Sequence, residues 1–426
     1  MSSPIDSQFS APFEGPEKLL EVWFAPSAAD VPDACTAPDA RSGLRNVDRK
    51  IWEEMLDIVQ CKILSAIRGE EMDAYLLSES SFFVFPHRLI LKTCGTTLNL
   101  LGLPRILEIA AKEANLPSVY RCFYSRKSFM FPERQHGPHR EWKHEVQYLD
   151  NIFHKGAAYT VGKVNGDHWL LYLTGPTERL PLPNSQNFPI RDLSCDFDDD
   201  DTPPDYTIEI LMSELSPAAR EPFFTPATEA IDSSDYALSL SQKLGISSIF
   251  PPELTTLDAY SFTPCGYSAN ALLKWGDDSA SAHPPISGEG YYTIHVTPEA
   301  GWSYASFECN VPLSVVSNDS SCTGSVTPQS IPDLATLIQR VVSIFQPGRL
   351  TLTLFISSKD NNSAEEETGE TAVEAAQRAF RGALMGLASP TKNDATPGIY
   401  KRTDKINYEF GGYDLAFASF ELVGER

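Results

Sequence analysis

The chain has 426 residues, of which 42% are hydrophobic and 21% are charged, so it can bury one large core or two fused ones and is not disordered. Its 34 Lys and Arg against 57 Asp and Glu give a formal net charge of -23, which disfavours nucleic acid or an anionic membrane surface as a partner. No run reaches the ~18 apolar residues of a membrane span, and the first residues lack the basic and apolar regions of a signal peptide, so we expect a cytosolic protein.

The first half of the chain predicts helices and strands in alternation. Apolar residues that recur every three or four positions indicate helices, and those that recur every second position indicate strands. In chain order the elements are a helix beginning within Glu17–Phe24, a helix that carries Trp52, Met55, Leu56, Val59 and Ile63, strands at Tyr75–Leu77 and Leu89–Lys92, helices at Ile106–Ala114 and Trp142–Phe153, and strand alternation over Ala157–Leu173.

The second half predicts the same order of elements. They are a helix-compatible segment at Asp205–Leu215, a strand pair at Tyr291–Val296 and Ser303–Glu308, a helix at Leu334–Phe345, and strands at Leu350–Phe355 and Tyr413–Glu421. Two similar halves, each with sheet-forming strands and covering helices, predict an α+β protein in which two sheets pack together with helices outside.

Three segments are typical of solvated, mobile insertions. They are the Ala-, Asp- and Pro-rich segment 27–42, the segment 184–204 with its CDFDDDDTPP run, and the segment 359–370 with NNSAEEETGE. They contribute much of the excess acid, so part of the net charge belongs to surface loops and not to a site.

The cysteines and histidines show no metal-ligand spacing. The eight cysteines, at positions 35, 61, 94, 122, 195, 265, 309 and 322, contain no CxxC, and the eight histidines form no HxxxH or HExxH pair. A chain of this length does not need disulfides to stabilise its fold, so we expect reduced thiols and no metal site.

The segment Tyr75–Thr97, YLLSESSFFVFPHRLILKTCGTT, contains Glu79, Ser80 and Ser81 and then Cys94 between strand-like runs. A serine hydroxyl beside a strained peptide bond can attack the preceding carbonyl and convert the amide into an ester. β-Elimination from that ester leaves a pyruvoyl group, whose keto carbon can act as the electron sink otherwise supplied by pyridoxal phosphate. Because a serine in a turn is more often a hydrogen-bonding turn residue, the Glu-Ser dipeptide alone does not choose between these interpretations.

Six separated blocks resemble the S-adenosylmethionine decarboxylase proenzymes of eukaryotes, of the fungal and animal type. They are FEGPEKLLEVWF from Phe13, the Tyr75–Thr97 segment, FYSRKSFMFP from Phe123, DYTIEILMSEL from Asp205, FTPCGYSAN from Phe262, and YYTIHVTPEAGWSYASFECN from Tyr291. The blocks occur in the family's order and span most of the chain. The resemblance implies a four-layer αββα sandwich of two mainly antiparallel sheets, a single domain over 1–426 from duplicated halves at about 13–183 and 205–426.

The resemblance also implies the reaction and its catalytic residues. The chain would cut itself between Glu79 and Ser80 into 1–79 and 80–426, and Ser80 would become the pyruvoyl group that forms a Schiff base with S-adenosylmethionine, without a metal or pyridoxal phosphate. Cys94 matches the proton donor, and a thiol near its ordinary pKa can donate at neutral pH. Ser268, His295 and Glu17 match residues that assist self-cleavage.

Substrate-binding residues follow from the same blocks. Phe13 and Phe262 match the two aromatic residues that sandwich the adenine, although by residue type alone both could be core residues. Glu299 matches the carboxylate that accepts both ribose hydroxyls, a task suited to two carboxylate oxygens. Glu14 would lie near the substrate.

A second, acidic site for putrescine is implied as well. The matching residues are Glu21, Asp205, Glu209 and Glu308, with Lys92, Thr207, Phe123 and Phe355 around them. Buried carboxylates in such number raise one another's pKa unless cations intervene, which a diammonium ligand would provide. We therefore expect activation by putrescine and a possible homodimer of cut chains, and the resemblance implies that the decarboxylated product is the aminopropyl donor for spermidine and spermine synthesis.

Two other functions remain open. A catalytically inactive regulatory relative, paired with an active decarboxylase, should have lost the cleavage serine or its helpers, yet all of them are present here. A hydrolase using Ser80 or Cys94 with His295 is disfavoured because neither residue lies in a nucleophile elbow.

Overall fold

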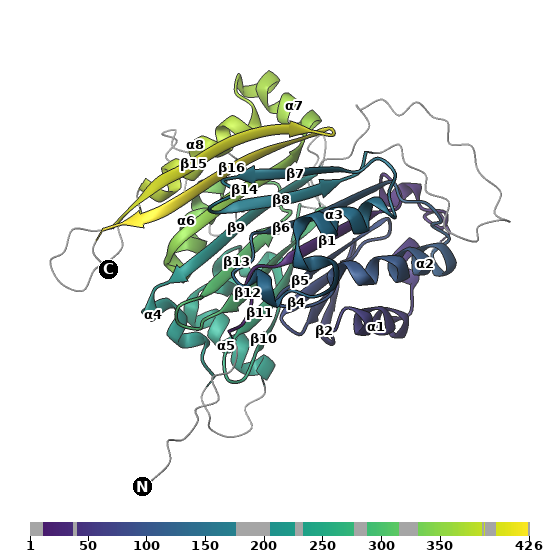
Figure 1. Ribbon diagram of the computed structural model, residues 1–426, viewed down its shortest axis with the longest axis horizontal. Helices are drawn as coiled ribbons and strands as arrows, with labels where there is room; N and C mark the ends of the chain where they lie inside the picture. The colour runs from purple at the N-terminus through teal and green to yellow at the C-terminus, as the bar shows by residue number, and fades with distance from the viewer. Residues whose placement is uncertain are drawn as a thin grey trace, which may run out of the picture.

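Two antiparallel sheets form the centre of the protein. The computed structural model describes residues 12–36, 41–175, 205–225, 233–276, 288–314, 331–385, 387 and 398–424. Within these residues each sheet has eight strands, and every neighbouring pair is antiparallel. The first half of the chain forms one sheet and the second half forms the other, as the colours of Figure 1 show.

The two sheets have the same strand order. The first runs, from edge to edge, β2 (Ile63–Arg68), β3 (Asp73–Leu77), β4 (Ser80–Val84), β5 (Arg88–Thr93), β1 (Lys18–Trp23), β6 (Arg121–Lys127), β8 (His168–Leu173), β7 (Ala157–Gly162). The second runs β10 (Thr255–Ser261), β11 (Tyr267–Trp275), β12 (Gly288–Thr297), β13 (Tyr304–Cys309), β9 (Tyr206–Leu215), β14 (Pro347–Ser357), β16 (Tyr413–Val423), β15 (Ile399–Phe410). The repeated order is what a duplicated half predicts.

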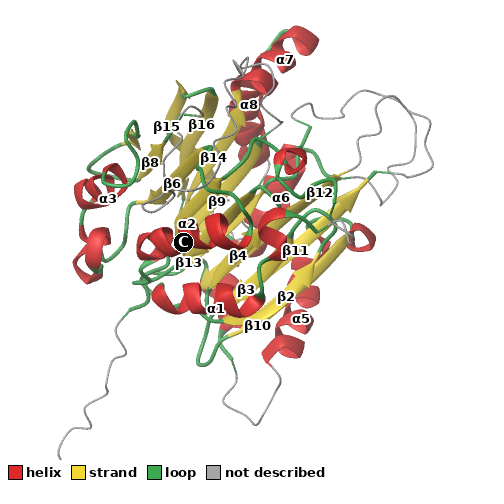
Figure 2. Ribbon diagram, turned by 90° about the vertical axis from the view of Figure 1, so that its right-hand side faces the viewer, coloured by secondary structure: helices red, strands yellow, loops and turns green. Residues whose placement is uncertain are grey.

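Helices cover the outer faces of both sheets (Figures 1 and 2). They are α1 (Arg49–Ile58), α2 (Leu103–Glu113), α3 (Trp142–Asp150), α4 (Pro217–Arg220), α5 (Ser233–Leu244), α6 (Leu334–Phe345), α7 (Ser358–Thr368) and α8 (Ala372–Met385). Short 3₁₀ helices lie at Ala28–Asp30, Gly43–Asn46, Asn99–Gly102, Pro132–Arg134, Gly137–Arg140, Glu221–Phe223, Ile246–Ser248 and Pro252–Leu254.

Separate cores hold the four layers together. The outer core of the first sheet packs Phe82 of β4 with residues of α1, α2 and α3, and that of the second packs Ile294 of β12 with residues of α5, α6 and α8. Between the sheets Phe83 of β4 stacks on Tyr291 of β12, with ring centroids 4.1 Å apart. The expected αββα sandwich is therefore confirmed.

Most of the predicted elements are confirmed, but two predicted helices are wrong. Glu17–Phe24 and Asp205–Leu215 form the strands β1 and β9, the fifth of the eight strands in each sheet. Both strands belong to a sheet that has a helix layer on one face and the other sheet on the opposite face, so both of their faces are largely buried. In β9 the outer-core residues Ile208, Ile210 and Met212 do alternate with the polar Thr207, Glu209 and Ser213, so the period of two is present in this run and the helix prediction missed it. The helix through Trp52 ends at Ile58, and Ile63 belongs to β2.

The three predicted insertions differ from one another. The described part of 27–42 contains a 3₁₀ helix and is anchored, since Val31 is buried and the Asp33 carboxylate accepts from the Gly43 backbone N–H at 2.8 Å. Segment 359–370 is not a loop but most of α7, which is largely exposed and begins at the capping residue Ser357. Segment 184–204 lies outside the described residues.

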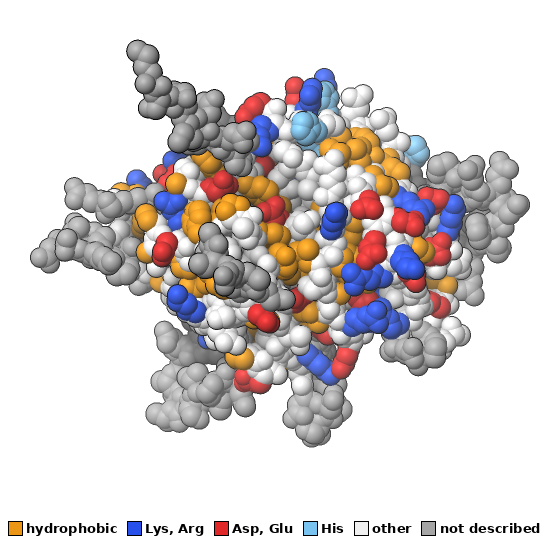
Figure 3. All heavy atoms as spheres, turned by 90° about the horizontal axis from the view of Figure 1, so that it is seen from below, with side chains coloured by type: hydrophobic (Ala, Val, Ile, Leu, Met, Phe, Trp, Pro, Cys, Tyr) orange, Lys and Arg blue, Asp and Glu red, His pale blue; other side chains and the backbone are white. Residues whose placement is uncertain are grey.

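One face of the protein is mixed in charge (Figure 3). Figure 3 shows acidic and basic side chains close together on one face, with hydrophobic side chains between them. In the described ranges, no helix combines the length and the apolar character that crossing a membrane requires.

Candidate active site

The turn between β3 and β4 presents the Glu79–Ser80 peptide bond. Leu77 pairs with Ser80, so Ser78 and Glu79 form a two-residue hairpin loop. Glu79 has a φ of 56°, a left-handed conformation that costs a non-glycine residue on the order of 1–3 kcal/mol. Backbone strain is therefore stored on the residue whose carbonyl belongs to the proposed cleavage site.

The Ser80 hydroxyl and the Glu79 carbonyl oxygen both lie next to the Cys94 thiol. The Ser80 hydroxyl is fully buried, accepts from the Cys94 backbone N–H at 3.4 Å, and lies 3.9 Å from the Cys94 sulfur and 3.8 Å from that of Cys61. The Cys94 thiol also donates to the Glu79 carbonyl oxygen. A group that polarises the carbonyl thus sits beside the hydroxyl that would attack it.

The Cys94 thiol is a protonated group in this setting. Burial raises its pKa well above the ordinary value, and the carboxyl groups of Glu79 and Glu17 raise it further. The expectation of a thiol with a nearly ordinary pKa is therefore wrong, because Cys94 is buried and lies near two carboxyl groups that the sequence did not place beside it. The shift keeps the proton on sulfur at neutral pH, so Cys94 can still donate it.

Ser81 points to the opposite face of β4, toward the second sheet. Strand side chains alternate, so Phe82 faces the outer helices together with Ser80, and Phe83 faces the second sheet together with Ser81. The Ser81 Oγ lies 3.0 Å from His295 Nε2. His295 therefore lies on the side of β4 opposite to the Ser80 hydroxyl.

His295 and Ser268 form a hydrogen-bonded pair. They face each other on β12 and β11, with Nδ1 2.9 Å from the Ser268 Oγ. Burial, and then the positive charge of Lys92, lower the pKa of His295 to about 3. The imidazole is therefore neutral at physiological pH and has one basic nitrogen.

Phe13, Glu299 and the cleavage turn lie together. The Phe13 backbone N–H donates to Glu299 Oε2 at 3.3 Å, and the Phe13 ring packs against Gly95, where a Cβ would come within 3.3 Å of it. Burial, and then the Glu299 carboxylate, raise the pKa of Glu79 to about 7. The residues matched to the ribose and adenine sites thus adjoin the proposed cleavage site.

Phe262 and Glu14 have contacts of their own in the structure. The ring centroid of Phe262 lies 5.0 Å from that of Tyr260. Glu14 is buried, and its carboxylate accepts from the backbone N–H groups of Met130 at 2.7 Å and Phe131 at 2.8 Å. Glu14 therefore holds the loop after β6.

Glu17 joins the acidic region between the sheets. Its carboxylate accepts from the hydroxyls of Tyr304, at 2.9 Å, and Ser306. Burial raises its pKa, and Lys92 opposes that shift. Both hydroxyl groups lie on β13 in the second sheet, and the Glu17 carboxyl in turn raises the pKa of Cys94 beside the cleavage turn.

Two buried cations divide the acidic cluster into two groups. Arg88 lies 2.9 Å from Glu21 and 3.3 Å from Asp205, and Lys92 lies 2.5 Å from Glu308 and 3.6 Å from Glu209. The carboxyls of this region are Glu17, Glu21, Asp205, Glu209 and Glu308. Burial raises the pKa of both Glu21 and Glu209 to about 7. The two cations lower these pKa values only in part, because five carboxyls share them.

Aromatic rings close one side of the cluster. The ring centroid of Phe123 lies 5.5 Å from that of Phe355 and 5.2 Å from that of Tyr413. Phe355 stacks on Tyr413 with ring centroids 4.5 Å apart. Thr207 is paired with Phe355 on β9 and β14. All eight residues matched to the putrescine site therefore gather between the sheets.

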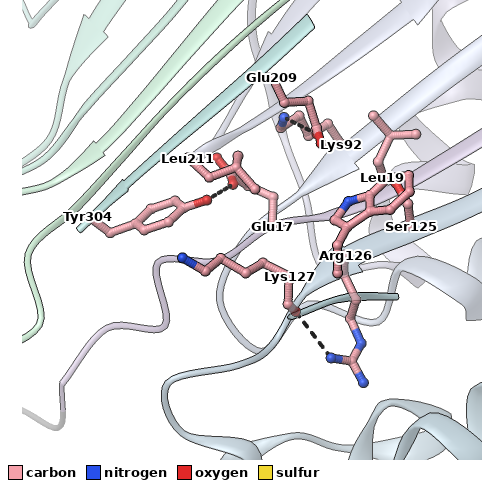
Figure 4. A pocket seen from close by; sticks show the side chains of 10 residues that line it. Glu17, Leu19, Lys92, Ser125, Arg126, Lys127, Glu209, Leu211 and Tyr304 are labelled. Atoms are coloured by element: carbon pink, nitrogen blue, oxygen red, sulfur yellow. Dashed lines mark hydrogen bonds and ion pairs between the residues drawn. The ribbon is translucent and has the colours of Figure 1, made fainter. Parts of the chain in front are cut away.

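A small pocket adjoins Lys92 and Glu209. Its lining comes from both sheets and consists of Glu17, Leu19, Lys92, Ser125, Arg126, Lys127, Trp169, Glu209, Leu211 and Tyr304. Figure 4 shows the Glu17 and Tyr304 side chains in contact on one side and Lys92 close to Glu209 on the other. A polar ligand in this pocket would contact two of the carboxyls directly.

The described cysteines form no disulfide. Cys35, Cys61, Cys94, Cys122, Cys265 and Cys309 are all free thiols. Within the same described ranges, no cluster of three or more His, Cys, Asp or Glu side chains is arranged as a set of metal ligands.

Several site residues were missed by sequence reasoning. They are Cys61 and Ser81 beside the cleavage bond, Asn270 and Thr293 around Ser81, and Arg88, Tyr291 and Tyr413 in the acidic cluster. Strand alternation could have identified Ser81, which follows Ser80 and must face the other way. The others are brought in by contacts between the sheets, for which the sequence has no local signal.

The chain is similar to known proteins over nearly its whole length. Residues 10–421 match the family model described as adenosylmethionine decarboxylase. The S-adenosylmethionine decarboxylase proenzyme of Saccharomyces cerevisiae is 32% identical over 99% of this chain and 95% of its own, and that of Xenopus laevis is 33% identical over 96% of each. A solved structure of the Trypanosoma brucei AdoMetDC-delta26 monomer has a TM-score of 0.49 and 19% identity, over 80% of this chain and 99% of its own. The match of the family model and the identity to both relatives show that the chain belongs to the adenosylmethionine decarboxylase family.

Proposed function

We propose that this chain cuts itself between Glu79 and Ser80 and then decarboxylates S-adenosylmethionine with the resulting pyruvoyl group. The observation that supports this most strongly is the pairing of a buried Ser80 hydroxyl with a Glu79 carbonyl that accepts from the Cys94 thiol. The product, S-adenosylmethioninamine, is an aminopropyl donor for spermidine and spermine.

Self-cleavage begins with an acyl shift. The Ser80 hydroxyl attacks the Glu79 carbonyl carbon, the C–N bond breaks, and the hydroxyl proton passes to the nitrogen, so that an ester replaces the amide. The Cys94 thiol stabilises the charge that develops on the carbonyl oxygen. The strained φ of Glu79 lies next to the amide bond that this step replaces.

Elimination then separates the two chains. His295 removes the α-hydrogen of Ser80, the electron pair forms the Cα–Cβ double bond, and Glu79 leaves as a carboxylate with the ester oxygen. Addition of water and loss of ammonia leave the pyruvoyl group on residues 80–426. The neutral imidazole on the face opposite to the Ser80 hydroxyl is suited to this step, since base and leaving group then act from opposite sides.

The residues around the turn would bind and protonate the substrate. The pyruvoyl group supplies an electrophilic carbonyl that takes up the electron pair released with carbon dioxide. Cys94 returns a proton to the substrate α-carbon, while Phe13 and Phe262 contact the adenine and Glu299 accepts the ribose hydroxyls. Release of carbon dioxide from S-adenosylmethionine, blocked by phenylhydrazine, tests the proposal. Full activity in the presence of this carbonyl reagent would exclude a pyruvoyl group.

Glu299→Gln should weaken substrate binding more than it slows turnover. The amide replaces one acceptor oxygen with a donor and removes the charge, and a hydrogen bond to a charged group contributes about 1.5–3 kcal/mol. We expect KM for S-adenosylmethionine to rise about 10- to 100-fold with a smaller change in kcat. Glu253→Gln, at an exposed carboxylate, is the matched control, and an unchanged KM in Glu299→Gln would remove Glu299 from the ribose site.

We further propose that putrescine binds the acidic cluster and activates the enzyme. Five carboxyls and two resident cations leave an excess of negative charge between the sheets. A diammonium ion would neutralise it, with the aromatic rings of Phe123 and Phe355 beside its methylene chain. Binding at the cluster would favour the conformation that is competent for cleavage and turnover.

Putrescine should bind more tightly as the pH rises from 6 to 8. The pKa of Glu21 and of Glu209 in the folded protein is about 7, above the ordinary 4.5, so each carboxyl is largely protonated below pH 7. The protonated carboxyls favour the folded state, and this contribution to stability is lost as the pH rises through 7. A dication favours the ionised carboxyls, so binding releases protons and the Kd should fall about tenfold for each carboxyl that must ionise.

Calorimetric titration with putrescine at pH 6 and pH 8, in two buffers of different ionisation enthalpy, measures both the Kd and the protons released. Glu209→Gln should lose its share of the proton release. A Kd that is constant or rises over this interval would contradict the proposed site.

A further inference from the structure

Ser81 lies at the centre of a buried hydrogen-bond network. Its Oγ lies 2.6 Å from Asn270 Oδ1, 2.9 Å from Thr293 Oγ1 and 3.0 Å from His295 Nε2. Ser81, Asn270 and Thr293 are all fully buried. With no solvent to accept or supply hydrogens, the direction of each hydrogen bond is set by the neighbouring groups.

Asn270 fixes the direction of the network. Its Nδ2 donates to the Tyr75 backbone carbonyl at 3.0 Å, and because a carbonyl oxygen only accepts, the opposite orientation of the amide would place two acceptors against each other. Oδ1 therefore faces Ser81, and an amide oxygen only accepts. The Ser81 hydroxyl must give its one hydrogen to Asn270.

His295 must then donate from Nε2. The Ser81 oxygen has no hydrogen left for it, and Thr293, 3.2 Å away, gives its own hydrogen to the Ala269 carbonyl at 3.1 Å. Both oxygens near Nε2 are therefore acceptors. A neutral imidazole has one N–H, so Nδ1 has the free electron pair and accepts from the Ser268 hydroxyl at 2.9 Å.

We infer that Asn270, acting through Ser81, is a positioning residue that holds His295 in the Nε2–H tautomer and makes Nδ1 its basic atom. The inference rests on the proposed self-cleavage. In the elimination step the Cα–H bond of Ser80 breaks and an N–H bond forms at Nδ1, either directly or through the Ser268 hydroxyl, which would take the α-hydrogen while passing its own to Nδ1. The Cα–Cβ double bond forms as the Glu79 carboxylate leaves.

Asn270→Ala tests the inference by freeing the Ser81 hydrogen. Ser81 can then donate to Nε2, which favours the Nδ1–H tautomer. Nδ1 then has no free electron pair and is no longer the base. We expect the elimination to slow about 10- to 100-fold, measured as the appearance of the two fragments from freshly translated chain. The acyl shift does not need His295, so the ester intermediate should accumulate. Neutral hydroxylamine, which cleaves esters but not amides, should cleave this intermediate after Glu79.

Two further variants separate positioning from packing. Asn270→Asp keeps the shape, and its protonated form can replace both hydrogen bonds, so cleavage should be close to that of the unsubstituted chain at low pH and slow as that carboxyl ionises. Asn361→Ala removes another buried asparagine, which accepts from the Val373 backbone N–H at 3.0 Å, and should cut normally. Cleavage of folded Asn270→Ala at the unsubstituted rate would overturn the inference.

A spectroscopic measurement does not depend on cleavage. In Ser80→Ala, a long-range proton–nitrogen NMR spectrum of histidine-labelled protein distinguishes the protonated from the unprotonated ring nitrogen, and His295→Ala assigns the signal. We expect the hydrogen on Nε2, and a hydrogen on Nδ1 would overturn the inference even if Asn270→Ala fails to fold. If the unsubstituted chain never cuts itself, the proposed function fails, and this spectrum still decides the tautomer.

Discussion

Ser80→Ala is expected to leave the chain uncut, as one species of 47.1 kDa, with no decarboxylation above background. Alanine has no hydroxyl to attack the Glu79 carbonyl, and no pyruvoyl group can form without the serine oxygen as a leaving group. The substitution removes one oxygen from a fully buried site, so the fold should persist. Mass spectrometry of the purified protein and an assay of carbon dioxide release measure both outcomes.

Ser78→Ala is the matched control for this experiment. Ser78 lies in the same two-residue turn and accepts from the Lys62 backbone N–H at 3.3 Å, but it is not adjacent to the cleaved bond. It should be cut and active. If Ser80→Ala were cut between residues 79 and 80, the nucleophile would have to be another group, and Cys94 would be the nearest one to examine.

Cys94→Ala should lower the decarboxylation rate of the cut enzyme by about 10²- to 10⁴-fold, which is the usual effect of removing a general acid. Its buried thiol stays protonated at neutral pH and lies beside Ser80, where the proposed pyruvoyl group would form. Without this donor, protonation at the wrong carbon would transaminate and inactivate the protein. The number of turnovers before inactivation should therefore fall together with kcat.

Self-cleavage of Cys94→Ala has to be measured separately, because the same thiol contacts the Glu79 carbonyl. The rate is therefore expressed per cut chain. Cys122→Ala is the control, since Cys122 is equally buried but belongs to the outer core of the first sheet. Normal turnover by cut Cys94→Ala, without inactivation, would assign the proton transfer to another residue.

The fold could be predicted from the sequence where burial is one-sided. Helix α6, with one apolar face, was predicted with its observed limits Leu334–Phe345, because its apolar residues recur at helical spacing. The strands β1 and β9 were predicted as helices because they are buried by a helix layer on one side and by the other sheet on the opposite side. Polar residues such as Thr207, Glu209 and Ser213 do lie at alternating positions of β9, but they face the other sheet and not solvent, so the run has no exposed polar face that would mark it as one side of a sheet.

The candidate site could be predicted where its residues lie together in one short sequence segment. Ser80 and Cys94 were found from one segment, and the structure brings their side chains to within 3.9 Å. The network around Ser81 could not be predicted, because its contacts join residues about 190 to 215 positions apart in the chain. The same holds for Arg88, whose pairing with Asp205 depends on how the two sheets face each other.

The most direct test of the account is the intact mass of the purified chain, before and after cyanoborohydride reduction in the presence of S-adenosylmethionine. The account predicts two fragments that divide between Glu79 and position 80, of which the longer has a blocked N-terminus and gains mass on reduction. A single uncut chain that gains no mass, with putrescine present or absent, would contradict self-cleavage and favour an inactive regulatory relative.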